Sequence, residues 1–203
     1  MVKKSDKPKA PKHWDRTPWP TSGDESQDVT YTSVGQALSE WERYESDLSF
    51  LFANFLGGAV LRGAMRSYNA VRTFQGRCDL LRAASESYFD GYHPKADFLL
   101  DDFKTILASA NKFAERRNEI AHGVVDIFRQ SPRDSQNITS IETYAIYPSY
   151  STFKERDLDS IPTYCYTSKE LDYFCDEFRK LRAPVLALAA NLVIVVSMAR
   201  LET

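Results

Sequence analysis

Hydrophobic residues recur every three or four positions along most of the chain, which is the spacing of helices that bury one face. Four such runs each predict a long helix: Thr32 to Gly57-Gly58, Leu61 to Tyr88, Lys95 to Gly123, and Thr167 to about Leu201. Glycine is a common helix stop because it adopts the left-handed backbone conformation without strain. The pattern therefore predicts a mainly α protein, a bundle of four long helices.

The last run carries two local signals and one ambiguity. Thr167 and Glu170 have the spacing of a capping box, and Pro184, which lacks a backbone N–H, predicts a kink. The segment from Ala183 to Ala199 contains no charged residue, so a membrane anchor is one interpretation. Because the segment is short for a bilayer and contains Asn191, we predict a buried central helix and no membrane association.

The helical period is lost between the third and fourth runs. Three segments there alternate or are rich in β-branched and aromatic residues: Val124 to Phe128, Ile141 to Tyr147, and Tyr164 to Tyr166. Polar stretches separate them, which is typical of turns and loops. We therefore expect a small antiparallel β insert over about residues 124–167, inside a helical domain that spans residues 30–203.

Residues 1–29 are rich in Lys, Pro, Ser and Asp and lack an apolar period, which predicts a flexible N-terminal tail. Trp14 and Trp19 are unusual in such a segment. Two interpretations remain open for them. The tail docks through these rings in a groove of its own domain or of a partner, or it is solvated and its aromatic residues are incidental.

Composition limits the kinds of function. The chain has 203 residues, with 26 Lys and Arg against 28 Asp and Glu, so any nucleic-acid site must be a local one. Its three cysteines contain no Cys-x-x-Cys pair, which favours neither a disulfide framework nor a structural metal. A polar N-terminus without an apolar core is not a secretory signal, and a cytoplasmic location fits best.

One cluster of polar residues, at the end of the third run, has the groups that phosphodiester chemistry needs. Asn118 and His122 are four residues apart and lie on one helix face, with Arg117 beside Asn118. A guanidinium binds two phosphate oxygens, and an imidazole transfers protons near neutral pH. The cluster therefore favours RNA cleavage by the 2′-hydroxyl, with no metal or other cofactor. Two proton transfers are needed, which a symmetric homodimer would supply with two imidazoles.

Arg117-Asn118-Glu119-Ile120-Ala121-His122-Gly123 resembles the signature of the HEPN superfamily (higher eukaryotes and prokaryotes nucleotide-binding domain). That signature is an arginine, four to six residues beginning with a polar one, and a histidine near the end of a long helix. The resemblance implies a metal-independent endoribonuclease that acts as a homodimer, commonly a toxin or phage-defence effector with an antitoxin or effector partner. It also implies catalytic roles for Arg117 and His122 and a positioning role for Asn118.

Further basic residues would form a track for RNA. Arg62, Arg66 and Arg77 fall within an arc of about 60° if the second run is one helix, and Lys112 and Arg116 lie near the cluster. The other interpretation of these arginines is a solvated helix face. The alternative to a nuclease is a non-catalytic HEPN-like module that binds a protein or a nucleotide. In that case His122 serves only to stabilise the carbonyl end of its helix.

Overall fold

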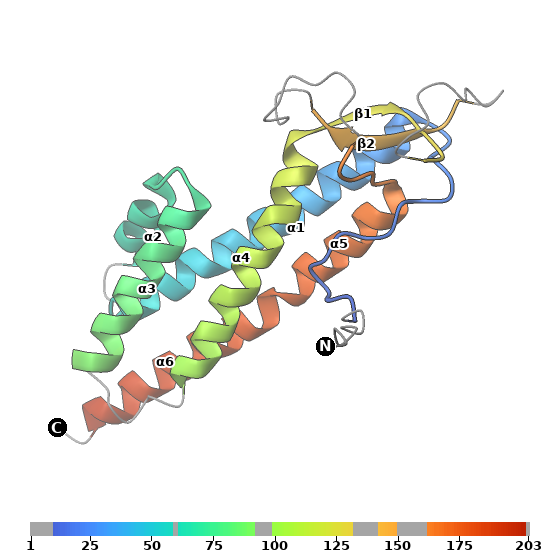
Figure 1. The fold of residues 1–203 in the computed structure, drawn as a ribbon. Helices are drawn as coiled ribbons and strands as arrows, with labels where there is room; N and C mark the ends of the chain where they lie inside the picture. Colours follow the sequence, from blue (N-terminus) through green and yellow to red (C-terminus); the bar gives the residue numbers. More distant parts are fainter. Residues whose placement is uncertain (1–9, 59–60, 92–98, 132–141, 150–161, 202–203) are drawn as a thin grey trace, which may run out of the picture.

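The computed structural model describes residues 10–58, 61–91, 99–131, 142–149 and 162–201. Within them the chain is mainly helical with a small antiparallel sheet, as predicted (Figure 1). The elements are α1 (Gln27–Phe55), α2 (Leu61–Ala70), α3 (Phe74–Gly91), α4 (Leu100–His122), β1 (Gly123–Ile127), β2 (Tyr144–Pro148), α5 (Ser168–Lys180) and α6 (Arg182–Leu201). Lys95, the predicted start of the third helix, lies outside the described residues.

Helix α1 is the centre of the bundle and packs against every other helix. Its inner face carries Trp41, Tyr44, Leu48 and Leu51, all of them buried. The Trp41 ring lies 5.2 Å from the ring of Phe178 on α5 and 5.2 Å from that of Phe74 on α3. The run of apolar positions in α1 therefore joins elements that are far apart in the sequence.

The second predicted helix is two helices, α2 and α3, separated by residues 71–73. Thr73 begins α3: its hydroxyl accepts a hydrogen bond from the Gly76 backbone N–H at 3.2 Å, and its carbonyl accepts one from the N–H of Arg77 at 3.1 Å. The Val71 carbonyl is bound by the Arg77 Nε at 2.9 Å. Local hydrogen bonds thus replace the helical ones at this corner, while the apolar spacing continues across it.

The fourth run is also divided, at Leu181, between α5 and α6. Pro184 has no N–H to donate to the Lys180 carbonyl, which explains a break three residues before the proline. The prediction that this apolar segment is the buried central helix is wrong, because α6 lies at the edge of the bundle and exposes Leu186, Val193 and Ile194. In the part of the chain that the structure describes, no helix combines the length and hydropathy needed to cross a membrane.

The sheet continues directly from α4. β1 pairs antiparallel with β2, with Val125 opposite Ile146, while the third predicted strand contributes only a bridge from Tyr166 to Ile146. Gly123 joins α4 to β1 in an extended conformation rather than a left-handed one. A Cβ atom at this glycine would lie 2.5 Å from the Ile146 side chain, so close packing of the sheet on the helix end requires glycine here.

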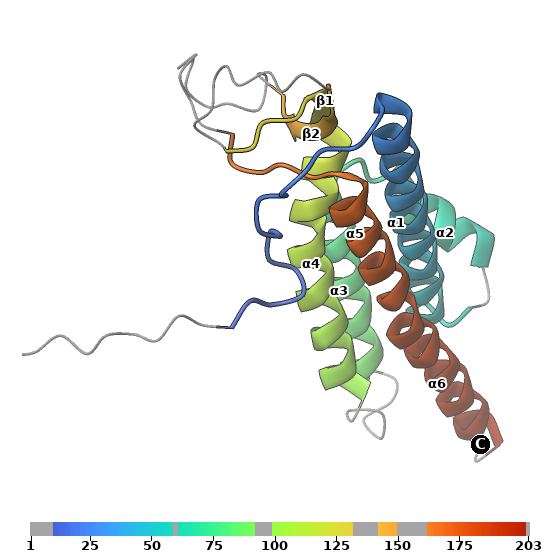
Figure 2. The same cartoon turned by 90° about the vertical axis from the view of Figure 1, so that its right-hand side faces the viewer.

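The N-terminal segment, residues 10–26, lies along the helices of its own domain, and α1 begins at Gln27 (Figure 2). Trp14 makes an edge contact with Phe113 of α4 at 6.3 Å, and Trp19 packs on Tyr147 of β2. The Asp24 carboxylate accepts hydrogen bonds from Thr30 and from Ser168. Of the two interpretations of the tryptophans, docking on the same domain is the one observed.

Candidate functional site

Arg117 lies on α4 with its side chain partly exposed, at 29%. Its Nη1 donates to the Asn118 Oδ1 at 3.2 Å, and its Nη2 lies 3.5 Å from the Glu42 Oε1 on α1. Its Nε–H is buried and has no hydrogen-bond partner among the described residues. Arg117 is therefore held by two polar contacts among the described residues, and part of its side chain is open to solvent.

Arg117 and Asn118 line an open cleft of about 530 Å³, which we call the Arg117 cleft. Its walls come from three parts of the chain. Helix α1 contributes Glu42 and Glu45, the α2–α3 corner and the start of α3 contribute residues 72–75 and 77, and α4 contributes residues 111, 114, 115, 117 and 118. The volume is in the range of small-ligand sites.

His122 is the last residue of α4 and is exposed. It is not among the residues that line the Arg117 cleft, and it makes no hydrogen bond or ion pair with any residue that the structure describes. Five positions separate it from Arg117, which is roughly 140° around a helix. One chain therefore brings Arg117 and Asn118 together on the cleft and leaves His122 outside it, at the same end of α4.

The residues of the expected RNA track do not lie on one continuous helix. Arg62 and Arg66 are exposed on α2, but the corner at 71–73 separates them from Arg77 on α3, which forms an ion pair with the buried Glu45. Lys112 is exposed on α4 and does not line the cleft. The single helix that would have aligned the three arginines is two helices.

Arg116 was also expected on the RNA surface, and the structure places it elsewhere. Its side chain is only 8% exposed, and its Nη2 lies 3.1 Å from Glu119 and 3.3 Å from Glu115. An arginine buried in this way neutralises the carboxylates beside it. We therefore assign Arg116 a structural role.

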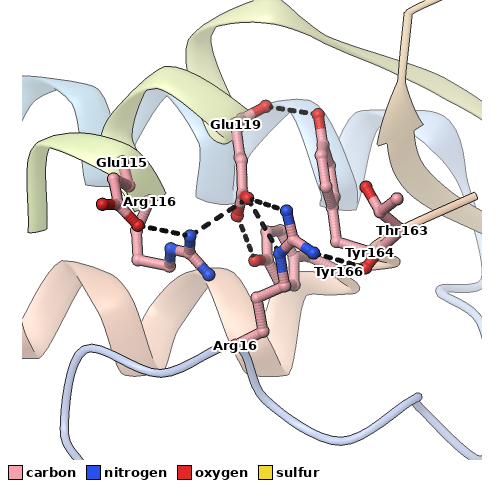
Figure 3. A network of polar contacts seen from close by, with 7 residues as sticks. All are labelled: Arg16, Glu115, Arg116, Glu119, Thr163, Tyr164 and Tyr166. Atoms are coloured by element: carbon pink, nitrogen blue, oxygen red, sulfur yellow. Dashed lines mark hydrogen bonds and ion pairs between the residues drawn. The ribbon is translucent and has the colours of Figure 1, made fainter. Parts of the chain in front are cut away.

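Glu119, between Arg117 and His122 in the sequence, anchors the end of α4 (Figure 3). Its carboxylate accepts hydrogen bonds from the Arg16 Nη2 at 2.7 Å and from the Tyr166 hydroxyl at 2.6 Å. Its carbonyl, one of the last four of the helix, accepts one from the Tyr164 hydroxyl at 2.9 Å. Burial raises the pKa of both tyrosines, so both remain neutral donors.

The structure adds cleft residues that the sequence analysis did not identify, mainly Arg72, Thr73 and Gln75 of the α2–α3 corner. The only local signal is that two β-branched residues, Val71 and Thr73, flank Arg72 within a helical run. Among the described residues, no group of three or more His, Cys, Asp or Glu side chains is arranged to hold a metal ion. No family model matches the chain, and the comparisons with curated proteins and with solved structures found no match either.

Proposed function

We propose that this protein is a metal-independent endoribonuclease of HEPN type that cleaves RNA as a homodimer. The observation that supports the proposal best is the placement of Arg117, whose partly exposed side chain lines an open cleft beside Asn118. Such a group can bind two oxygens of a phosphodiester and stabilise the charge that develops on them. A role as a toxin or phage-defence effector, held inactive by a partner, belongs to the same proposal.

Each residue of the motif has one task in this reaction. Arg117 binds the scissile phosphate, and Asn118, whose Oδ1 lies 3.2 Å from the Arg117 Nη1, orients the guanidinium. The 2′-hydroxyl loses its proton and attacks phosphorus, the bond from phosphorus to the 5′-oxygen breaks, and that oxygen is protonated. The products are a 2′,3′-cyclic phosphate and a 5′-hydroxyl end. His122 of each protomer carries out one of the two proton transfers.

A second candidate function is a non-catalytic interaction module of the same fold. The observation that favours it is the position of His122, which lies outside the residues that line the Arg117 cleft. In such a module His122 interacts only with the carbonyl end of α4. Its replacement would then change stability by about 0.3–1 kcal/mol and leave ligand binding intact.

The test is cleavage of a single-stranded RNA by the purified protein in the presence of a chelator. We expect cleavage without added metal and a loss of about 100-fold or more in His122→Ala and in Arg117→Ala. His13→Ala is the matched control, because His13 is also exposed but lies on the N-terminal segment. Cleavage that requires a divalent metal, or that survives His122→Ala, would exclude the nuclease.

A further inference from the structure

The α2–α3 corner brings a second guanidinium to the Arg117 cleft. Arg72 lies between the two helices, is exposed, and lines the same cleft as Arg117 from a different wall. In one continuous helix from Leu61 to Tyr88 the backbone at Arg72 would be helical. The break at residues 71–73 therefore gives Arg72 its position on the cleft.

Arg72 differs from the other cleft arginines in its charge environment. Arg77 is neutralised by the buried Glu45, and Arg117 faces Glu42 at 3.5 Å. Arg72 forms no ion pair or hydrogen bond with any residue in the described ranges. Of the three arginines that line the cleft, Arg72 is therefore the one that can bind an anion without first breaking an ion pair with a carboxylate.

The same wall offers groups that suit a nucleobase. Phe74 lines the cleft and is only partly buried, with its ring supported by Trp41 at 5.2 Å and tilted by 57°. Gln75 lines the cleft on this wall as well, and Asn111 lines it from α4. Aromatic rings beside guanidinium groups are how proteins bind single-stranded nucleic acids, whose bases are free to stack.

We propose that the Arg117 cleft binds single-stranded RNA across two adjacent phosphates, with Arg117 on the scissile phosphate and Arg72 on a neighbouring one. The base between them stacks on Phe74. This assignment rests on the proposed function for the identity of the scissile phosphate. It makes Arg72 and Phe74 substrate-binding residues that lie outside the motif.

The first experiment measures binding of a 2′-O-methyl oligouridylate, which resists cleavage, by fluorescence anisotropy at several salt concentrations. We expect Arg72→Ala to weaken binding about tenfold and to lower the slope of log K against log salt by about 0.7, which corresponds to one lost phosphate contact. Arg82→Ala is the matched control, since Arg82 is an exposed arginine of α3 that does not line the cleft. Equal effects of the two variants, or an oligonucleotide that does not bind, would overturn the proposal.

The second experiment tests the stacking contact. Phe74→Leu keeps an apolar side chain against Trp41 and removes the aromatic face. Introducing one abasic position into the oligonucleotide should weaken binding to the wild-type protein several-fold and should matter little to the Phe74→Leu variant. If the abasic position weakens binding equally in the wild-type protein and in the Phe74→Leu variant, the base does not stack on Phe74.

The outcomes separate this inference from the proposed function. Binding that depends on Arg72 without any cleavage of unmodified RNA supports the inference and excludes the nuclease. Cleavage that depends on His122 but is indifferent to Arg72→Ala supports the nuclease and overturns the inference.

Discussion

In the proposed RNA complex, Glu42 would compete with phosphate for Arg117. The two side chains are 3.5 Å apart at their closest atoms, and Glu42 is 65% exposed, so their ion pair contributes little to stability. We expect Glu42→Gln to raise the affinity for the 2′-O-methyl oligonucleotide several-fold, because an anion no longer has to displace a carboxylate. The free energy of unfolding should change by less than about 1 kcal/mol. Anisotropy and thermal unfolding measure the two quantities.

The control for this prediction is Glu86→Gln, which removes an equal charge from an exposed position of α3 that does not line the cleft. An affinity gain of the same size in Glu86→Gln would assign the effect to net charge rather than to competition at Arg117. Reduced affinity in Glu42→Gln would indicate that Glu42 itself contacts the ligand.

The buried thiols give a prediction on pH. Burial raises the pKa of Cys78 to about 11 and that of Cys165 to about 12. The folded state therefore binds these protons more tightly than the unfolded state does. The resulting stability is complete below the ordinary thiol value near 9 and is lost as pH rises through 11 and 12. Denaturant unfolding from pH 8 to 11 should show the free energy of unfolding falling above about pH 9. The fall should be smaller in the Cys78→Ser variant than in the wild-type protein.

The contact between Arg16 and Glu119 joins the N-terminal segment to the helix that carries the motif. Arg16→Ala removes three hydrogen bonds of the guanidinium, two to Glu119 and one to the Thr163 carbonyl, but the Arg16 side chain is 43% exposed, so we expect a cost of only about 0.5–1 kcal/mol. Its main effect should be faster proteolysis within residues 10–26. Glu119→Ala should cost more, about 3 kcal/mol, because it leaves the buried Arg116 with only Glu115.

Thermal unfolding and limited proteolysis measure these effects, and Arg43→Ala is the control. Arg43 is itself exposed and forms an ion pair with the buried Glu40 one turn away on the same helix, so this contact does not join two elements. If Arg16→Ala were cut no faster than Arg43→Ala, Trp14 and Asp24 would be sufficient to hold the segment.

The sequence predicted the helix ends correctly where they depend on contacts between residues that are close in the chain. The capping box is present, with the Thr167 backbone N–H donating to the Glu170 carboxylate at 3.0 Å, and Gly57 and Gly58 end α1 with φ of 82° and 68°. The corner at residues 71–73 was missed because Val71 and Phe74 keep the three-residue apolar spacing across it. Periodicity records which positions face the core, and it does not record whether the backbone between them is continuous.

At the scale of the whole molecule, the motif was readable in the sequence and the cleft was not. Arg117, Asn118 and His122 lie within six residues, whereas the cleft joins Glu42, Arg72 and Arg117 from three separate elements. Their proximity depends on the packing of α1, α3 and α4 against one another. Tertiary packing of this kind has no local pattern, so only the structure identified Arg72.

The exposed apolar residues of α6 point to a second possible dimer geometry. Helix α6 extends to the end of the bundle opposite β1, whereas His122 directly precedes β1 (Figure 1). A dimer formed through α6 would therefore hold two separate motifs, and a dimer formed through the motif face would bring both imidazoles to one site. Mass measurement in solution shows whether a dimer exists, and it does not distinguish these geometries.

Mixing wild-type protein with an excess of the His122→Ala variant does distinguish them. If the site is shared, a heterodimer holds only one of the two imidazoles that the proposed reaction uses, so it should be inactive. RNA cleavage should then fall with the square of the wild-type fraction after subunit exchange. In a dimer that holds two separate motifs each wild-type protomer would keep its own activity, so a loss merely proportional to the wild-type fraction, in a mixture that forms heterodimers by native mass spectrometry, would contradict a shared site.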